Sequence, residues 1–270
     1  MEMLFPDLTK HPRWLRGQTK PWCDQLAAQT GKYEYPWSFL AEGTTVEEAF
    51  TERLSGLIRG NVLDVGCGHG EYTKRWSDRA REVVGYDMTV GFLATANQDR
   101  PANVRFVLGK THEGLPFADE SFDVAYTKKG PTSWYPESGR ILRAGADVLA
   151  LHPGGAAGDS PSLADYFPGL FAPPKQGESL LELVRERLAL GGLAIAEIQE
   201  VRETGHIPTP EDILAMACFG QHEQLTRWVK ETCFAEIERQ FERRRDEQGI
   251  RTTSLCYLIH AKKGKGPAPQ

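Results

Sequence analysis

The chain has 270 residues, of which 40% are hydrophobic and 26% charged, and it carries a net charge of −5 with a pI of about 5.9. This composition is typical of a globular protein, and the length allows one large α/β domain or one domain with appendages. The acidic balance argues against a dedicated nucleic-acid binder, which usually has a basic domain. No apolar run approaches the length of a membrane span and the N-terminus lacks a signal-peptide pattern, so we expect a cytoplasmic protein without a membrane partner.

Residues 1–43 contain four prolines and three of the six tryptophans. So many aromatic residues in a short polar segment should pack against another part of the chain. Two interpretations stay open: an arm that covers one face of a sheet, and a lid over a ligand site. The main domain is expected over 44–262, and it begins with a capping box at Thr45–Glu48 that opens a helix to about residue 59.

The apolar run Val62–Val65 predicts a buried parallel strand. Glycines follow it at the alternate positions 66, 68 and 70. A chain that leaves a strand must turn sharply here, and glycine adopts backbone angles that other residues resist. A helix is expected to begin near Gly70, with its free N–H groups facing a ligand.

A second strand, Val83–Asp87, ends in an acid that lies 21 residues after Gly66. In a strand–helix–strand unit, an acid at about this distance hydrogen-bonds the hydroxyls of a ribose. A dinucleotide site would share these features. Two observations argue against it, because Asp64 precedes the glycines within the first strand and the glycines are spaced G-x-G-x-G rather than G-x-G-x-x-G.

Together these segments resemble the class I S-adenosylmethionine-dependent methyltransferases, and among them the type 11 methyltransferase domain. Val62–Gly70 is similar to the first motif of the family and Val83–Asp87 to the second, while Leu115–Phe117 and Ser121–Asp123 match it at its usual spacing. The resemblance implies the cofactor S-adenosyl-L-methionine. It also implies an α/β fold, with a Rossmann-like, mostly parallel sheet of seven strands in the order 3-2-1-4-5-7-6, an antiparallel last strand and helices on both faces.

The remaining elements follow from hydrophobic periodicity. Helices are expected at about 71–80, 88–96, 178–190, 209–219 and 224–247, and strands at about 103–108, 122–127, 147–151, 193–201 and 252–260. The loop at about 153–177 is rich in Gly and Pro and too long for a plain connection, so we interpret it as an insertion with contacts of its own. Residues 263–270 are expected to form a disordered basic tail. The pattern shows no second core, so one domain is expected.

The resemblance assigns the cofactor cradle to the glycine turn and to the acids of the first two strands. These residues are Asp64, Gly66, Cys67, Gly68 and Asp87. Asp64 is expected to hold the turn or to meet the donor's amino group indirectly. Met88 directly follows the second acid, and it either packs against adenine, as in the family, or is a plain core methionine.

The sequence departs from the family on the adenine side of this site. The aspartate that usually accepts from the adenine amino group falls on Thr111, and its neighbour falls on His112. The hydroxyl of Thr111 could accept the same hydrogen bond, although as a neutral and weaker partner than a carboxylate.

Two lysines, Lys128 and Lys129, follow the fourth strand at the edge where open α/β sheets bind ligands, and Trp134 and Tyr135 come soon after. One interpretation is a site wall, in which Lys128 lies beside the cofactor, a lysine meets an anionic group and the aromatic rings stack on a flat acceptor. The other is a solvated loop with an aromatic anchor.

The best single candidate for a general base is His152, which stands at the end of the fifth strand, because an imidazole can accept a proton near neutrality. Lys129 is the second catalytic candidate, and His112 and Glu113 are also considered. His69, inside the glycine turn, is expected to hydrogen-bond locally. The five cysteines and the acids show no metal-binding spacing, so we expect reduced cysteines and no metal.

The sequence therefore predicts an S-adenosylmethionine-dependent methyltransferase that acts on a small-molecule acceptor. Two alternatives stay open. One is a methyltransferase for RNA or protein, with a basic rim formed by Arg13, Arg16, Lys20, Lys128 and Lys129. The other is a protein that binds S-adenosylmethionine without catalysis, because the acid on the adenine side is missing.

Overall fold

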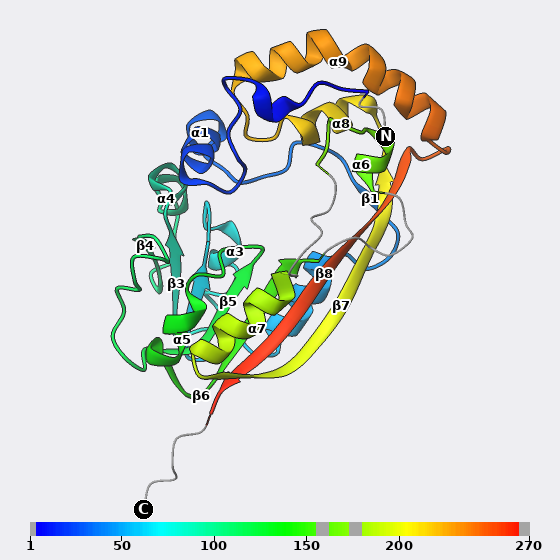
Figure 1. Ribbon diagram of the computed structural model, residues 1–270. Coiled ribbons are helices and arrows are strands. Elements are labelled where there is room, and N and C mark those ends of the chain that lie inside the picture. Colours follow the sequence, from blue (N-terminus) through cyan, green and yellow to red (C-terminus); the bar gives the residue numbers. More distant parts are fainter. Residues whose placement is uncertain (1–3, 155–161, 173–179, 265–270) are drawn as a thin grey trace, which may run out of the picture. The chain divides into compact units, whose positions relative to one another are not determined.

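The computed structural model describes residues 4–154, 162–172 and 180–264, and the expected C-terminal tail lies almost entirely outside them. Strands form one sheet in the order β1-β7-β8-β6-β5-β2-β3-β4 (Figure 1). The strands are β1 (Leu40–Ala41), β2 (Asn61–Val65), β3 (Glu82–Asp87), β4 (Val104–Leu108), β5 (Phe122–Lys128), β6 (Leu142–Pro153), β7 (Leu193–Ile207) and β8 (Ile250–Lys263).

The sheet has the expected order and one strand more than expected. β2 pairs in parallel with β3 and β5, β4 in parallel with β3, and β6 in parallel with β5, whereas β8 is antiparallel to β6. When β1 is left out and β2 to β8 are numbered 1 to 7, the sheet read from β4 has the order 3-2-1-4-5-7-6. β1 adds an eighth, antiparallel strand beside β7, and its two exposed residues were too few to show any alternation in the sequence.

The helices are α1 (Lys20–Thr30), α2 (Val46–Ser55), α3 (Glu71–Lys74), α4 (Val90–Ala96), α5 (Tyr135–Ile141), α6 (Leu163–Tyr166), α7 (Leu180–Leu190), α8 (Pro210–Ala217) and α9 (Glu223–Arg244). α3 is shorter than the expected helix over 71–80. Its last turn tightens, because Trp76 N–H donates to Thr73 C=O and Ser77 N–H to Lys74 C=O, which is the 3₁₀ pattern.

The chain forms two compact units. The first consists of the described residues of 4–45, 162–172 and 202–255, and the second of those of 46–154, 180–201 and 256–264. β7 and β8 each contribute residues to both units. The expectation of a single core was wrong, because the first unit has a core cluster of its own.

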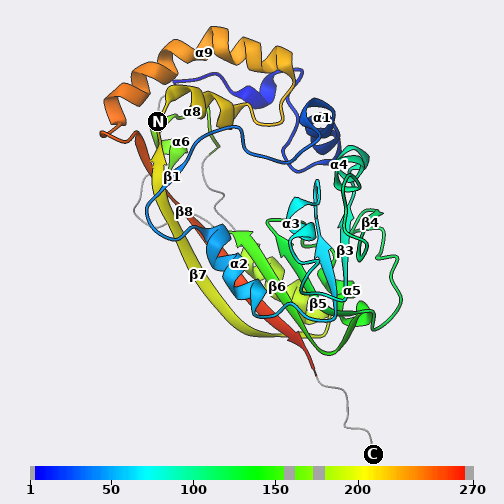
Figure 2. The ribbon, with the colours of Figure 1, turned by 180° about the vertical axis from the view of Figure 1, so that it is seen from behind.

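The core of the second unit lies on both faces of the sheet, because successive strand residues point to opposite sides. Leu63, Val84 and Ala125 belong to one cluster, while their neighbours Val62, Val83 and Val124 belong to the other. Helices α5 and α7 cover the first cluster and lie in front of the sheet in Figure 1; α2 covers the second and lies in front in the reversed view of Figure 2. The expected helices on both faces are therefore confirmed.

The core of the first unit is built mainly from helices. Its buried α9 residues recur every four positions, and they are Leu225, Val229, Cys233, Ile237 and Phe241. Phe5 and Leu8 of the N-terminal segment join this cluster, as do Phe167 and Leu170 of the insertion. The role of residues 1–43 as a cover or a lid stays a prediction. Among the described residues, no helix is both long enough and apolar enough to cross a membrane.

Candidate functional site

The glycine turn lies directly after β2. Gly66, Gly68 and Gly70 have φ angles of 81°, 55° and 77°, in the left-handed region that disfavours side chains. A Cβ atom at Gly66 would lie 2.8 Å from Cδ of Pro131, and one at Gly70 would lie 2.5 Å from the ring of Phe106. Both glycines are therefore required by backbone angle and by close packing, and the turn presents bare backbone.

Asp87, at the end of β3, holds this turn in place. Its Oδ2 accepts from Gly68 N–H at 2.9 Å and its Oδ1 from Thr89 N–H at 2.9 Å. Loss of solvent raises the pKa of Asp87, although these hydrogen bonds lower it in part. A carboxylate has about four lone-pair positions. Gly68 and Thr89 N–H each occupy one oxygen, and the carboxylate remains a suitable acceptor for the hydroxyl of a ribose.

Asp64, inside β2, joins three elements beneath the turn. It is 3% exposed, and its Oδ2 accepts from Thr73 Oγ1 of α3 at 2.7 Å and from Tyr126 Oη of β5 at 2.9 Å. Burial raises the pKa of Asp64 to about 6, and the two hydroxyl donors act in the opposite direction. Sequence reasoning missed Thr73 and Tyr126. The one available signal was a tyrosine near the end of a mostly buried strand.

Lys128, the last residue of β5, is already occupied by protein groups. Its Nζ lies 2.7 Å from Oε1 of Glu47, in the first turn of α2, and 4.2 Å from the ring centroid of Tyr72. The hydroxyl of Tyr72 is in turn 3.0 Å from Thr51 Oγ1. Glu47 was not singled out from the sequence, because only tertiary contact brings it to the end of β5.

Lys129 differs from its neighbour. It is exposed and adopts a left-handed φ of 58°, which is uncommon for a residue with a side chain. Its N–H donates to Leu151 C=O at 2.8 Å, and a Cβ at the following Gly130 would collide with Thr127 Oγ1 and lie 2.8 Å from Val65 C=O. The loop is therefore fixed tightly on β2 while the lysine side chain remains accessible.

The residues expected on the adenine side have different surroundings. Thr111 Oγ1 lies 2.5 Å from Ser133 Oγ, so the Thr111 hydroxyl already has a polar partner that the sequence did not indicate. The side chain of His112 is 67% exposed, with its Nε2 3.9 Å from Oε1 of Glu113. Met88 is half-buried after β3. The cofactor roles of Thr111, His112 and Met88 stay predictions.

His152 does not face an open cleft as expected. It is 1% exposed, and its Nε2 lies 2.7 Å from the hydroxyl of Tyr135. Burial lowers the pKa of His152 to about 4, because the charged imidazolium is poorly solvated there. The side chain is therefore neutral near pH 7 and enclosed, which does not favour a base that must touch an acceptor.

Trp134 and Tyr135 are likewise fully buried. Their rings lie with centroids 4.6 Å apart. This placement favours the aromatic anchor over the exposed, stacking wall for these two residues.

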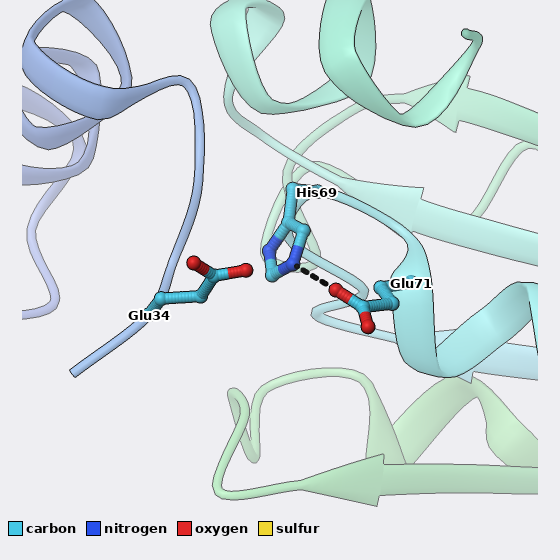
Figure 3. Close-up of side chains that lie close together, drawn as sticks. All are labelled: Glu34, His69 and Glu71. Carbon is cyan, nitrogen blue, oxygen red and sulfur yellow. Dashed lines mark hydrogen bonds and ion pairs between the residues drawn. The ribbon is translucent and has the colours of Figure 1, made fainter.

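His69 has the local contact that was expected. Its Nε2 lies 3.4 Å from Oε2 of Glu71, at the start of α3 (Figure 3). Glu34, also drawn in Figure 3, belongs to the first unit.

Comparison with known proteins identifies the central segment. Residues 62–155 match the model of a family described as a methyltransferase domain. A malonyl-[acyl-carrier protein] O-methyltransferase of Pseudescherichia vulneris is 32% identical over 96 residues, which are 36% of this chain and 36% of that protein. A demethylmenaquinone methyltransferase of Renibacterium salmoninarum is 39% identical over 69 residues, which are 25% of this chain and 28% of that protein. The aligned part therefore spans about a third of the length of these relatives.

A solved structure supports the fold over a longer range. A protein from Deinococcus radiodurans, described as functionally unknown, matches with a TM-score of 0.62 and 22% identity, over 89% of this chain and 98% of that one. This likeness shows the fold of the chain and does not bear on its chemistry.

Proposed function

We propose that this chain, which contains a class I S-adenosylmethionine-dependent methyltransferase domain, transfers a methyl group from S-adenosyl-L-methionine to a small-molecule acceptor. The observation that carries this proposal is the glycine turn after β2, whose Gly68 N–H is held by the carboxylate of Asp87. A bare backbone turn beside a strand-end acid suits a nucleoside.

The residues present fit this cofactor. Gly66 and Gly70 pack closely against Pro131 and Phe106, so a side chain at either position would distort the turn that carries the Gly68 N–H. Asp87 can accept from the ribose hydroxyls, and Thr111 with Ser133 can bond the adenine amino group. Cys67 and Gly68 are also assigned to the cofactor site, with Met88 and His112 beside it. Lys128, which is paired with Glu47, is assigned to its edge.

When bound, the cofactor supplies a methyl group already activated by the positive charge of its sulfonium. The protein then has to align the acceptor with that methyl group and to exclude water. A base is required only where the acceptor carries a proton. His152 is enclosed and Lys129 is exposed, so Lys129 is the better placed of the two catalytic candidates to touch an acceptor.

A carboxylate acceptor suits this site best. It is ionised near neutral pH, so its oxygen attacks without a base, and Lys129 could attract its charge. The relative named for malonyl-[acyl-carrier protein] has an acidic acceptor of this kind by name, whereas demethylmenaquinone is the acceptor named for the other relative. The expected cytoplasmic location stays a prediction.

The alternative of an RNA or protein acceptor receives less support. Two of the five basic residues expected to form a rim are held by acids, because Lys20 Nζ lies 2.6 Å from Asp24 Oδ2 and Lys128 Nζ lies 2.7 Å from Glu47 Oε1. Paired lysines offer less charge to a phosphate backbone.

Calorimetry with S-adenosylmethionine, followed by transfer of its labelled methyl group to separate pools of small carboxylic acids, RNA and protein, tests the proposal. We expect binding, and transfer to the small acids. Absence of donor binding would overturn the assignment, and binding without transfer to any pool would identify a non-catalytic binding protein.

A further inference from the structure

Among the described residues, the buried acid beneath the glycine turn has no cation in direct contact with it. Asp64 lies two residues before Gly66, and both of its hydrogen-bond donors, Thr73 Oγ1 and Tyr126 Oη, are neutral hydroxyls on Oδ2. In the described parts of the chain, no ion pair joins Asp64 to a lysine, arginine or histidine. A carboxylate in such surroundings is sensitive to any charge that arrives nearby.

Several charged or titratable groups face Asp64 from neighbouring elements. Lys128 on β5 favours its ionised form, while Asp87 on β3 disfavours it. Lys128 is itself partly neutralised by Glu47 of α2, at 2.7 Å. The other neighbours are uncharged near pH 7, namely the Cys67 thiol and the phenols of Tyr126 and Tyr72.

The ring of Tyr126 is enclosed by other rings, which holds its hydroxyl oxygen beside Asp64. Tyr126 is fully buried, and the centroid of its ring lies 5.9 Å from that of Tyr72 and 6.2 Å from that of Phe50. Because the hydroxyl donates to Asp64, it stabilises the ionised carboxylate more than the neutral carboxyl. Burial works in the opposite direction and places the pKa of Asp64 at about 6, within a range where folded proteins can be studied.

We propose that Asp64 and Tyr126 form a proton-linked device that senses the charge of the donor: binding of S-adenosylmethionine ionises Asp64, and S-adenosylhomocysteine does so less. This inference rests on the proposed function. In the step, the O–H bond of the Asp64 carboxyl breaks, its electron pair stays on the carboxylate, and the proton passes to buffer. The donor carries a sulfonium charge that the product lacks, so the ionised acid favours donor over product.

Tyr126 is a positioning residue in this account. Removal of its hydroxyl leaves the ionised carboxylate with one donor fewer, so the pKa of Asp64 rises. The midpoint of the pH dependence of donor binding should then move to higher pH. A residue that only filled space would change affinity by one factor at every pH.

Calorimetry of both ligands, between about pH 5 and pH 8 and in buffers of different ionisation enthalpy, tests the proposal. For the unaltered protein we expect proton release on donor binding below about pH 6, with affinity falling up to about tenfold per pH unit there. S-adenosylhomocysteine should release fewer protons and show a shallower slope. Equal proton release by the two ligands would overturn the inference.

Two variants and a matched control assign the effect. The Asp64→Asn variant should release far fewer protons on donor binding, namely only those that come from Asp87. In the Tyr126→Phe variant, the midpoint of the pH dependence of donor binding should shift to higher pH. Tyr86→Phe is the control, because Tyr86 is a buried tyrosine of β3, which pairs with β2, and its Oη donates to Gly114 C=O at 3.3 Å. The pH dependence of donor binding in this variant should match that of the unaltered protein.

The outcomes separate this inference from the proposed function. No donor binding at any pH would overturn both. Donor binding with an unshifted midpoint in a folded Tyr126→Phe variant would overturn the proton linkage and leave the proposed function in place. Should Asp64→Asn fail to fold, the shift in Tyr126→Phe still decides.

Discussion

Asp87 illustrates, at the scale of one residue, how a carboxylate can shape the backbone before any ligand arrives. Because both of its oxygens accept from N–H groups, the carboxylate and the turn hold each other in position before a ligand binds. We predict that Asp87→Ala weakens the binding of S-adenosylmethionine by about 1–3 kcal/mol, since charged hydrogen bonds to the ribose are lost. Calorimetry measures the change, with the exposed Asp78→Ala as control. Unchanged affinity in a folded Asp87→Ala variant would contradict this role.

His152 leads to a prediction about stability rather than turnover. Its pKa in the folded protein, about 4, lies below the ordinary value of about 6.5, because burial disfavours the charged form. Its contribution to stability is therefore fully present above about pH 6.5 and is lost as the pH falls towards 4. The loss amounts to about 3 kcal/mol.

Urea unfolding at a series of pH values measures this contribution. His152→Gln should flatten the dependence between about pH 6.5 and pH 4, whereas His112→Gln, at an exposed position, should not. A slope equal to that of the unaltered protein would show that the imidazole is not enclosed as described.

The sequence indicated the geometry of the turn where that geometry depends on local features. Gly66, Gly70 and Asp87 depend on backbone angles and on their position at strand ends, which a short motif contains. Thr73 and Tyr126 could not be identified, because their role depends on a contact with Asp64 over sequence separations of 9 and 62 residues. The burial of His152 and its hydrogen bond with Tyr135 were likewise not visible in the sequence.

At the scale of elements, the positions of the strands were predicted better than their lengths. β7 was expected over 193–201 and runs to Ile207, and β8 was expected over 252–260 and spans Ile250–Lys263. The added part of β7 is rich in charged and polar residues, so it lacks the hydrophobic alternation of a half-buried strand. Its pairing with β1, through Leu40 and His206, is a tertiary interaction that periodicity does not show.

The junction of β6 and β8 contains a buried acid held by a histidine and an arginine. Asp147 is 4% exposed, with its Oδ1 2.7 Å from Nε2 of His260 and its Oδ2 2.7 Å from Nη1 of Arg59. Burial raises the pKa of Asp147, but hydrogen bonds from His260 and Arg59 outweigh this effect and the pKa is lowered overall. The stability that it contributes is therefore present above its unfolded pKa of about 3.9 and is lost as the pH falls further.

We predict that Asp147→Asn costs about 1–3 kcal/mol at neutral pH, because charged hydrogen bonds are lost, and that the cost shrinks in acid. Urea unfolding between about pH 7 and pH 3 measures both effects. Asp78→Asn, at an exposed position, should leave the stability unchanged both at neutral pH and in acid. The assignment fails if the cost of Asp147→Asn is as large in acid as at neutral pH.

At the scale of the whole molecule, the core around the matched segment extends beyond that segment. The methyltransferase match ends at residue 155, yet the core around it includes Val184 and Leu188 of α7 and Ile259 and Ala261 of β8. β8 also pairs with β6 from Asp147 to Pro153.

We predict that a chain truncated after residue 249, and so without β8, loses cooperative unfolding. Each large apolar side chain left without its partners costs about 1.5–3 kcal/mol, against a net stability of about 5–15 kcal/mol. Near-ultraviolet circular dichroism during urea titration measures this, with removal of residues 265–270 as the control that should change little. A sharp, single transition in the shorter chain would contradict the prediction.

Cys67 has a consequence for the proposed handling of a reactive methyl donor. Loss of solvent around its sulfur, together with the carboxylates of Asp87 and Asp64, raises the pKa of the thiol well above its ordinary value, and the Sγ–H group points to Gly68 C=O at 3.8 Å. A thiolate here would be a nucleophile inside the cradle proposed for an alkylating agent, whereas a thiol is a poor one. We therefore expect the protein to be spared self-alkylation: mass spectrometry after prolonged storage with the donor should find Cys67 unmodified, and a methylated Cys67 would show that the thiol loses its proton there.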